Sequence, residues 1–480
     1  MSDYLVTDSE LTSVADAIRT KGGTSASLSF PTEFVSAIQN IPTGGGSTLG
    51  TKTITENGTY NASSDGYDGY SQVTVSVSGG GDQAEIDDVT FIDYDGTILY
   101  SYSKSDFLAL SAMPPNPSHA GLTAQGWNWT LAQAQAFITL NDSLCIGQNY
   151  KTVDGKTHII ADIDEFSVGL ELRIRMYTSV KSGVTVDWGD GSTSVPTGNA
   201  DTATYVNHTY QSIGTYEITI TATSGTYRLG YNGSNSSIFH YNSAATRATA
   251  YAIKEFYVGS DCTRLHRSCT GWCRNLEKIS LPTTLEKFGD SGAGSTGVFC
   301  NSLKLRGFVI PSTCEMQTLS IAEDLPALRI VSIGYGSITS NTVASRVTYE
   351  TRQLEMLTLP NISSFANSEV VYNSWGIKRF VAAGSYTTLY GGFFRNSGFL
   401  EKLIIPSSVT TISDYAMNSS SIKELHMKPT APPTVANKRG LPNNYGTIYV
   451  PYSADHSILD AYKTATNWTD FASIMQEEPQ

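Results

Sequence analysis

Three cysteines with a histidine between them are the first residues of the chain whose types could do chemistry. Cys262, Cys269 and Cys273 follow the spacing C-x6-C-x3-C, and His266 lies within it. Thiolates and imidazole are the usual zinc ligands, but zinc knuckles and ribbons pair their cysteines as C-x2-C. We therefore interpret these cysteines as small buried residues of a repeat, and we predict neither a metal site nor a cofactor.

Two aspartates that follow an apolar run suggest phosphoryl chemistry. In VTFIDYDGT, residues 89–97, Asp93 and Asp95 resemble the first motif of haloacid-dehalogenase-like phosphatases, where they would be nucleophile and general acid. That chemistry needs a doubly wound sheet with a Lys and further acidic residues on later strands, whereas residues 100–165 hold at most one helical run. We predict instead an Asp-Gly turn in a hairpin. No paired carboxylates typical of a wall hydrolase stand out either, so we expect no enzyme.

Composition favours a multi-domain, strand-rich protein. The chain has 480 residues, only 16% of them charged, with 42 Gly and 27 Tyr. Its net charge of −13 argues against a nucleic-acid partner, which requires a basic face. No run approaches the roughly 18 apolar residues of a membrane-spanning helix, so we expect no membrane insertion. The start, MSDYLVTDSE, has no secretory pattern, and we expect the chain to fold in a cytoplasm.

In the first third of the chain, the residue patterns predict small modules joined by glycine-rich linkers. Residues 1–42 carry two short amphipathic helical patterns, too small to be stable alone, which predicts docking on another subunit or in a trimer. A flexible linker at 43–47 precedes residues 48–78, whose alternating runs predict a hairpin or a small β module. Glycines at 79–81 form a second joint. Residues 85–165 mix strand and helix patterns and predict an α/β spacer domain.

Residues 167–225 alternate apolar and polar side chains, which predicts antiparallel strands. Three ordered blocks, WGDGS from Trp188, HTY from His208 and GTYEITI at 214–220, resemble a PKD-type immunoglobulin-like sandwich. The resemblance implies that Trp188 fills the core and that Asp190 begins a tight turn. We interpret His208 and Asp190 as core and turn residues rather than as a metal or catalytic pair.

The C-terminal part, residues 250–480, contains a repeated frame of apolar-x-x-apolar-x-apolar. The frame starts at Ile253, Leu276, Leu305, Leu328, Leu354, Ile377, Leu400, Ile422 and Tyr445. A period of about 23 residues with one short strand per copy resembles a leucine-rich-repeat solenoid of the BspA-like branch. Cys273 is one of the small residues that come three places before most frames. The run DAYKTATNWTDFASI predicts a helix that caps the last coil.

Alternation along each strand separates an inward from an outward face. The fourth and sixth places of the frame should face the core, and the third and fifth should face out. The outward ladder that we expect is Tyr257, Lys278, Ser280, Val309, Arg379, Lys402, Ile404, His426 and Tyr449. The candidate binding residues on it are Tyr257, Lys278, Arg379, Lys402, His426 and Tyr449. The cations could bind anionic wall polymers and the tyrosines could stack on sugars.

The order of these modules resembles tail and baseplate proteins of phages that infect Gram-positive hosts. The resemblance implies a virion protein whose N-terminal region binds other tail or baseplate subunits, whose C-terminal repeats bind a host cell-surface glycan or protein, and which forms a homo-oligomer, with a trimer favoured. It transfers no catalytic residue. The alternatives are a bacterial surface adhesin with BspA-like repeats and a purely structural virion decoration.

Overall fold

The structure is a computed structural model of the whole chain, and it contains two compact units, Met1–Glu85 and Ile86–Gln480. It describes residues 8–22, 25, 27–28, 32–39, 49–54, 69–75, 85–230, 237–239, 244–290, 298–316, 322–338, 347–365, 369–418, 420–442 and 444–479. The predicted linker and joint at 43–47 and 79–81 lie outside these residues. Within them, no helix combines the length and apolar character needed to cross a membrane.

The first unit contains two helices and two strands. Helix α1 (Asp8–Gly22) buries Ala15 and Ile18, and α2 (Thr32–Gln39) leaves Ile38 exposed. Strands β1 (Leu49–Ile54) and β2 (Gly69–Val75) pair in parallel. The hairpin alternative for residues 48–78 is therefore wrong, because a tight turn can join only antiparallel strands.

Residues 86–152 of the second unit form a small α/β domain. Its sheet has the order β4-β3-β6-β5, from strands β3 (Val89–Ile92), β4 (Ile98–Tyr102), β5 (Leu122–Trp127) and β6 (Leu144–Thr152). Helices α3 (Lys104–Leu108) and α4 (Leu131–Leu140) contribute Phe107 and Ile138 to its core. Strands β3 and β4 pair antiparallel, and the amide of Asp93 donates to the carbonyl of Thr97 at 2.8 Å across the turn between them. The predicted Asp-Gly hairpin turn is confirmed.

Two sheets then pack face to face. One contains β7 (Thr157–Ile163), β9 (Val184–Asp187), β10 (Thr193–Ser194) and β12 (Gly214–Ala222); the other contains β8 (Glu171–Thr178), β11 (Thr204–Thr209) and β13 (Tyr227–Leu229). Trp188 is buried between them with its indole stacked on the His208 ring at 5.0 Å. The His208 ring also contacts Asp190 at 2.7 Å, which places both residues in the packing of the sandwich. Strand β7 pairs with β12, so it belongs to this sandwich although it precedes residue 167.

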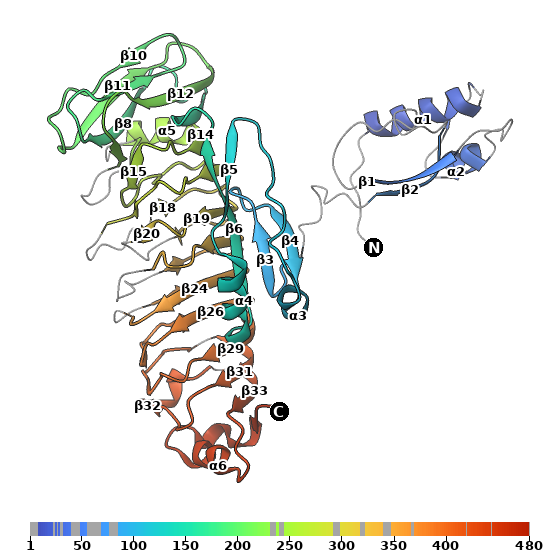
Figure 1. Cartoon of the computed structure of the whole chain (residues 1–480), viewed down its shortest axis with the longest axis vertical. Helices are drawn as coiled ribbons and strands as arrows, with labels where there is room; N and C mark the ends of the chain where they lie inside the picture. Colours follow the sequence, from blue (N-terminus) through green and yellow to red (C-terminus); the bar gives the residue numbers. More distant parts are fainter. Residues whose placement is uncertain are drawn as a thin grey trace. The chain divides into compact units, whose positions relative to one another are not determined.

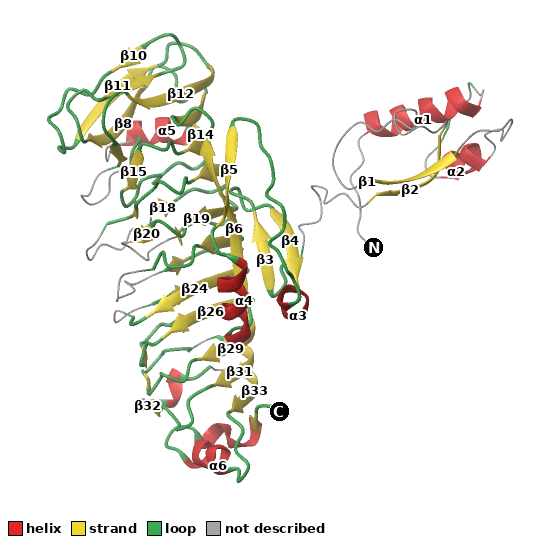
Figure 2. Ribbon diagram, in the orientation of Figure 1, coloured by secondary structure: helices red, strands yellow, loops and turns green. Residues whose placement is uncertain are grey.

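The sheets of the sandwich continue into the C-terminal solenoid (Figures 1 and 2). Strand β7 pairs antiparallel with β14 (Ile253–Tyr257), and β13 pairs parallel with β15 (Cys262–Leu265). The two sheets have the orders β10-β9-β12-β7-β14-β16 and β11-β8-β13-β15-β17-β20. The sandwich therefore covers the first coil of the solenoid, whose core would otherwise be open at that end.

Every predicted frame supplies one strand of the solenoid, which has about eight turns. After β14 these strands are β16 (Lys278–Ser280), β19 (Gly307–Ile310), β22 (Ile330–Ile333), β24 (Met356–Ile362), β26 (Arg379–Gly384), β29 (Phe399–Ile405), β31 (Ser421–Met427) and β33 (Asn444–Val450). The side chains at the fourth and sixth places are buried in all nine copies, from Phe256 to Val450. The predicted inward face is confirmed.

Shorter strands line other sides of the coils. One sheet contains β18 (Phe299–Cys300), β21 (Ala322–Glu323), β23 (Thr348–Tyr349), β25 (Val371–Tyr372) and β28 (Phe394–Arg395). The other short strands of the coils are β17 (Lys287–Phe288), β20 (Glu315–Met316), β27 (Thr388–Leu389), β30 (Thr411–Ile412) and β32 (Thr434–Val435). Helix α5 (Ala244–Tyr251) precedes the first coil.

The predicted C-terminal cap is present. Helix α6 (Ser457–Thr464) and the 3-10 helix η3 (Thr469–Ile474) bury Tyr462 and Trp468. The Trp468 indole donates to the carbonyl of Pro433 at 2.9 Å. Strand β34 (Met475–Glu477), which we did not predict, extends the sheet beside β33.

Candidate functional site: a charged hollow on the solenoid sheet

The small α/β domain covers the centre of the outward face of the solenoid sheet. Ile92 and Cys145 of the domain form one apolar cluster with Val309, Ile330 and Met356, which occupy outward places of three successive coils. Strand β6 runs past the solenoid strands from β19 to β24 (Figure 1) and packs on their outward side chains. The expectation that the whole outward face is open is therefore wrong: Ser280 and Val309 are both only 2% exposed.

Buried hydrogen bonds fix the small domain on this face. The Asn128 amide donates to the carbonyl of Ile310 at 3.0 Å and to the Ser332 hydroxyl at 2.9 Å. The Trp129 indole donates to the carbonyl of Ile333 at 2.9 Å. These bonds join buried polar groups of the small domain to those of the solenoid and so favour one arrangement, and the domain and the solenoid belong to one compact unit.

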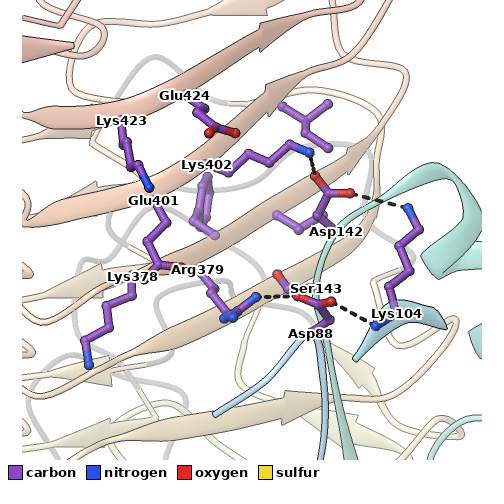
Figure 3. Close-up of a pocket in the computed structure, with 13 residues that line it drawn as sticks. Asp88, Lys104, Asp142, Ser143, Lys378, Arg379, Glu401, Lys402, Lys423 and Glu424 are labelled. Carbon is purple, nitrogen blue, oxygen red and sulfur yellow. Dashed lines mark hydrogen bonds and ion pairs between the residues drawn. The ribbon is translucent and has the colours of Figure 1, made fainter. Parts of the chain in front are cut away.

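A hollow of about 350 Å³ opens where the solenoid sheet emerges from beneath the small domain (Figure 3). Strands β26, β29 and β31 form one side, and residues next to β3, α3 and β6 form the other. Its lining residues are Asp88, Lys104, Asp142, Ser143, Lys378, Arg379, Phe380, Val381, Glu401, Lys402, Ile404, Lys423 and Glu424. These include five cationic and four anionic side chains, a local balance of +1 in a chain of net charge −13.

Ion pairs between the domain and the solenoid build the inner wall of the hollow. The Arg379 guanidinium lies 2.6 Å from the Asp88 carboxylate. Lys402 bonds the Asp142 carboxylate, which also lies 3.3 Å from the Lys104 ammonium. Figure 3 shows these pairs bridging the two parts of the chain. Lys104 also donates to the carbonyl of Asn141 at 3.0 Å, so it fixes the turn that carries Asp142.

The charge state of Asp142 depends on its two lysines. Burial alone would raise the pKa of this carboxyl, but the hydrogen bonds and charges of Lys402 and Lys104 outweigh it and hold the pKa below the ordinary value. The carboxylate is therefore charged at neutral pH.

The charged side chains at the outer rim of the hollow form fewer ion pairs than those of the inner wall. Within the described part of the chain, neither Lys423 nor Glu401 has a side-chain partner, and Lys378 is exposed although it lies 3.0 Å from Glu355. A ligand that carries both acceptors and donors could pair with these side chains without breaking the inner ion pairs. The arrangement suits binding of a polar ligand.

The six candidate residues do not form one surface. Arg379 and Lys402 lie in the hollow, but their charges already pair with the small domain. Tyr257 and Lys278 lie on the first coils, where both contact Glu255, at 2.6 and 2.9 Å. Burial raises the pKa of the Tyr257 phenol.

His426 and Tyr449 lie next to each other on the last coils. Their rings stack at 4.6 Å, and the His426 ring contacts the Glu478 carboxylate at 2.9 Å. His426 is 5% exposed, so its ring is a packing element of the cap.

Sequence reasoning missed the residues of the rim. Lys378, Glu401 and Lys423 occupy the second place of the frame, which belongs to neither the predicted inward face nor the predicted outward face. That place carries a charged side chain in eight of the nine copies: Lys254, Glu277, Arg306, Arg329, Glu355, Lys378, Glu401 and Lys423. This regularity could have indicated a charged edge along the sheet.

The residues considered for metal and phosphoryl chemistry take part in the fold. Cys262, Cys269 and Cys273 are buried free thiols, and burial raises their pKa, so they pack as small core residues as predicted. Asp93 is buried in the hairpin turn, 2.6 Å from His119. Over the described ranges, no three His, Cys, Asp or Glu side chains cluster as a metal site would require.

We expect Asp142→Asn to destabilise the protein by about 1 kcal/mol near neutral pH, because the pair is only partly shielded from solvent. Since the folded-state pKa lies below the ordinary value, this stabilisation is complete above pH of about 4 and is lost as the pH falls through the folded pKa. Urea unfolding at neutral and acid pH measures the difference. Asp261→Asn, at an exposed carboxylate, is the control and should show little difference at either pH. An Asp142→Asn effect that stays the same from neutral pH to the most acidic pH at which the protein is still folded would contradict this assignment.

Comparison with known proteins supports the solenoid. Residues 236–321 and 335–432 match the BspA type leucine-rich repeat region in six copies. A search of curated proteins found no match. The C-terminal part of the chain thus contains a BspA-type leucine-rich repeat region, and such repeats suggest an adhesin or a binding role.

Proposed function

We propose that the protein is a recognition protein that binds a cell-surface glycan or protein, without catalysis, at the charged hollow. The observation that carries this proposal is the hollow itself. It opens on a BspA-type repeat sheet, its inner ion pairs fix its shape, and its rim carries Lys423 and Glu401, whose side chains have no partner among the residues that the structure describes. A preformed site with few uncommitted polar groups binds at low entropic cost.

For the setting, we favour a phage tail or baseplate protein that acts outside the host after assembly in its cytoplasm. This finer proposal is supported by the resemblance of the N-terminal modules to phage tail proteins. The first unit also leaves Val14, Val35 and Ile38 about half exposed on its two short helices, which fits docking on tail subunits or on trimer mates. A bacterial surface adhesin with the same repeats is the second candidate, and the match to BspA-type repeats supports this candidate directly.

Binding of labelled protein to a panel of intact Gram-positive bacteria tests the recognition role. The double variant Lys378→Glu/Lys423→Glu reverses both rim cations, and we expect it to weaken binding about tenfold. Lys151→Glu/Lys181→Glu makes the same charge change at exposed lysines of the small domain and the sandwich, and it should bind like the wild type. No binding to any strain, or equal losses in the two double variants, would refute the proposal.

Immunogold labelling separates the two settings. Antibodies against the chain should label the tail tips of phage particles if the protein is a virion component. Label on the bacterial wall in the absence of particles would support the adhesin instead.

A further inference from the structure

A second surface lies across the core from the sheet that carries the hollow. It belongs to the sheet β18-β21-β23-β25-β28, in which each of the last four strands has one buried and one half-buried residue. The inward ring of Phe394 packs 5.7 Å from Phe380 of the hollow's sheet. The outward residues of the last three strands are Tyr349, Tyr372 and Arg395.

These outward side chains continue as one stack, which we call the tyrosine–arginine ladder: Tyr349, Tyr372, Arg395, Tyr415 and Arg439. The first two rings stack at 5.6 Å with an interplanar angle of 21°. The Arg395 guanidinium lies between two rings, 5.9 Å from Tyr372 and 5.2 Å from Tyr415. The Arg439 guanidinium also lies over the Tyr415 ring, 4.3 Å from its centre.

Arg395 differs from Arg439 in having no anionic partner. The Arg439 guanidinium lies 2.6 Å from the Asp414 carboxylate. Arg395 pairs with no carboxylate among the described residues, and its Nε is buried without a hydrogen bond. The residue as a whole is half-buried, so the donors left for a ligand are those on the two Nη atoms, whose planar arrangement matches a carboxylate in bidentate geometry.

The neighbourhood of Arg395 favours a sugar as the carrier of that carboxylate. Because stacking occupies the ring faces, Tyr372 offers its phenol edge and hydroxyl, which can pair with sugar hydroxyls. The same coil continues to Trp375. Of the six tryptophans, all within the described residues, Trp375 alone is exposed, at 59%. An exposed indole is an amphipathic surface on which a sugar ring can stack.

We infer that Arg395, which lies beside Tyr372 on the neighbouring coil, binds an acidic polysaccharide through a uronic-acid carboxylate, with the exposed Trp375 on the coil of Tyr372 as a second contact for the sugar chain. The inference names a ligand class for the proposed recognition role and rests on that role for its setting. The proposed Arg395 site lies on a different face from the hollow, so separate experiments can test the two sites.

Calorimetric titration of the full chain with an oligogalacturonate tests the inference. We expect binding that Arg395→Gln weakens about tenfold or more. Arg395→Lys, which keeps the charge but loses the planar fork, should also bind more weakly, and so should Trp375→Ala. Arg306→Gln, at an exposed arginine of the other sheet, should leave binding unchanged. Thermal melting of each variant confirms that it is folded.

Two comparison ligands test whether binding requires both the carboxylate and the sugar. Dextran, a neutral polysaccharide, should not bind, and polyglutamate, which carries carboxylates without sugars, should bind far more weakly than the oligogalacturonate. The inference is overturned if the wild type does not bind oligogalacturonate, if folded Arg395→Gln binds it equally well, or if polyglutamate binds as tightly. Because cell binding is tested through Lys378 and Lys423, its failure is distinguishable from failure at Arg395.

Discussion

Replacing Val309 with aspartate is expected to destabilise the protein by about 3–5 kcal/mol, because it would place an unpaired charge in a closed apolar interface. Val309 occupies an outward place of the repeat, which in an open solenoid would contact water. Here it packs with Cys145 and Ile330 under the small domain. A Cβ added to Gly147 would lie 2.4 Å from its side chain, so the interface has no room for water.

The control for this variant is Ile404→Asp. Ile404 occupies the same fifth place of the frame but lies in the hollow and is only half-buried. We expect it to cost about 1 kcal/mol. Equilibrium unfolding in urea measures both values, and equal costs at the two positions would show that the small domain does not cover Val309.

The second large effect is expected for Trp188→Ala, at about 3–5 kcal/mol, because truncation of a fully buried indole leaves a cavity. The indole also donates to the Ser194 hydroxyl at 2.9 Å. Since strand β7 pairs with both β12 and β14, the loss should lower the melting temperature of the solenoid together with the sandwich.

Scanning calorimetry distinguishes this coupling from independent domains. Trp375→Ala removes an exposed indole and should change stability by no more than about 0.5 kcal/mol. If Trp188→Ala produced an early unfolding transition for the sandwich and left the main transition unchanged, the result would show that the continuous sheets do not couple the stability of the sandwich to that of the solenoid.

The inward face of the solenoid could be predicted from the sequence because it depends only on local alternation. Phe308 and Ile310 are inward in every arrangement of that strand, whatever covers the other side. The burial of Cys273 could be predicted from a second local pattern, because Cys273 is one of the small residues that come three places before most frames, where stacked coils approach closely.

What covers the outward face could not be predicted in the same way. The contact between Asn128 and Ser332 joins positions about 200 residues apart in the sequence, and no local pattern specifies it. A signal was nevertheless present. The outward places of the central copies carry Val309, Ile330 and Met356, which are apolar where a solvated face would be polar.

The candidate binding residues were selected by residue type alone. Whether each side chain can bind a ligand depends on the ion pairs that it forms in the folded chain. Arg379 and Lys402 were placed on the correct face, but the carboxylates that neutralise them, Asp88 and Asp142, come from the small domain. A cation in the sequence indicates a charge and not whether the fold leaves it free. The same limit hid Arg395, whose significance comes from the partner it lacks.

Thiol labelling tests most directly the claim that the outward face is closed at its centre and open toward the C-terminal coils. All six native cysteines are buried, so an added thiol reports its own exposure. We predict that Thr447→Cys, on the last frame, reacts rapidly with a thiol reagent under native conditions, whereas Ser332→Cys, beneath Asn128, reacts only when the protein unfolds. Equal rates at the two positions would contradict the account.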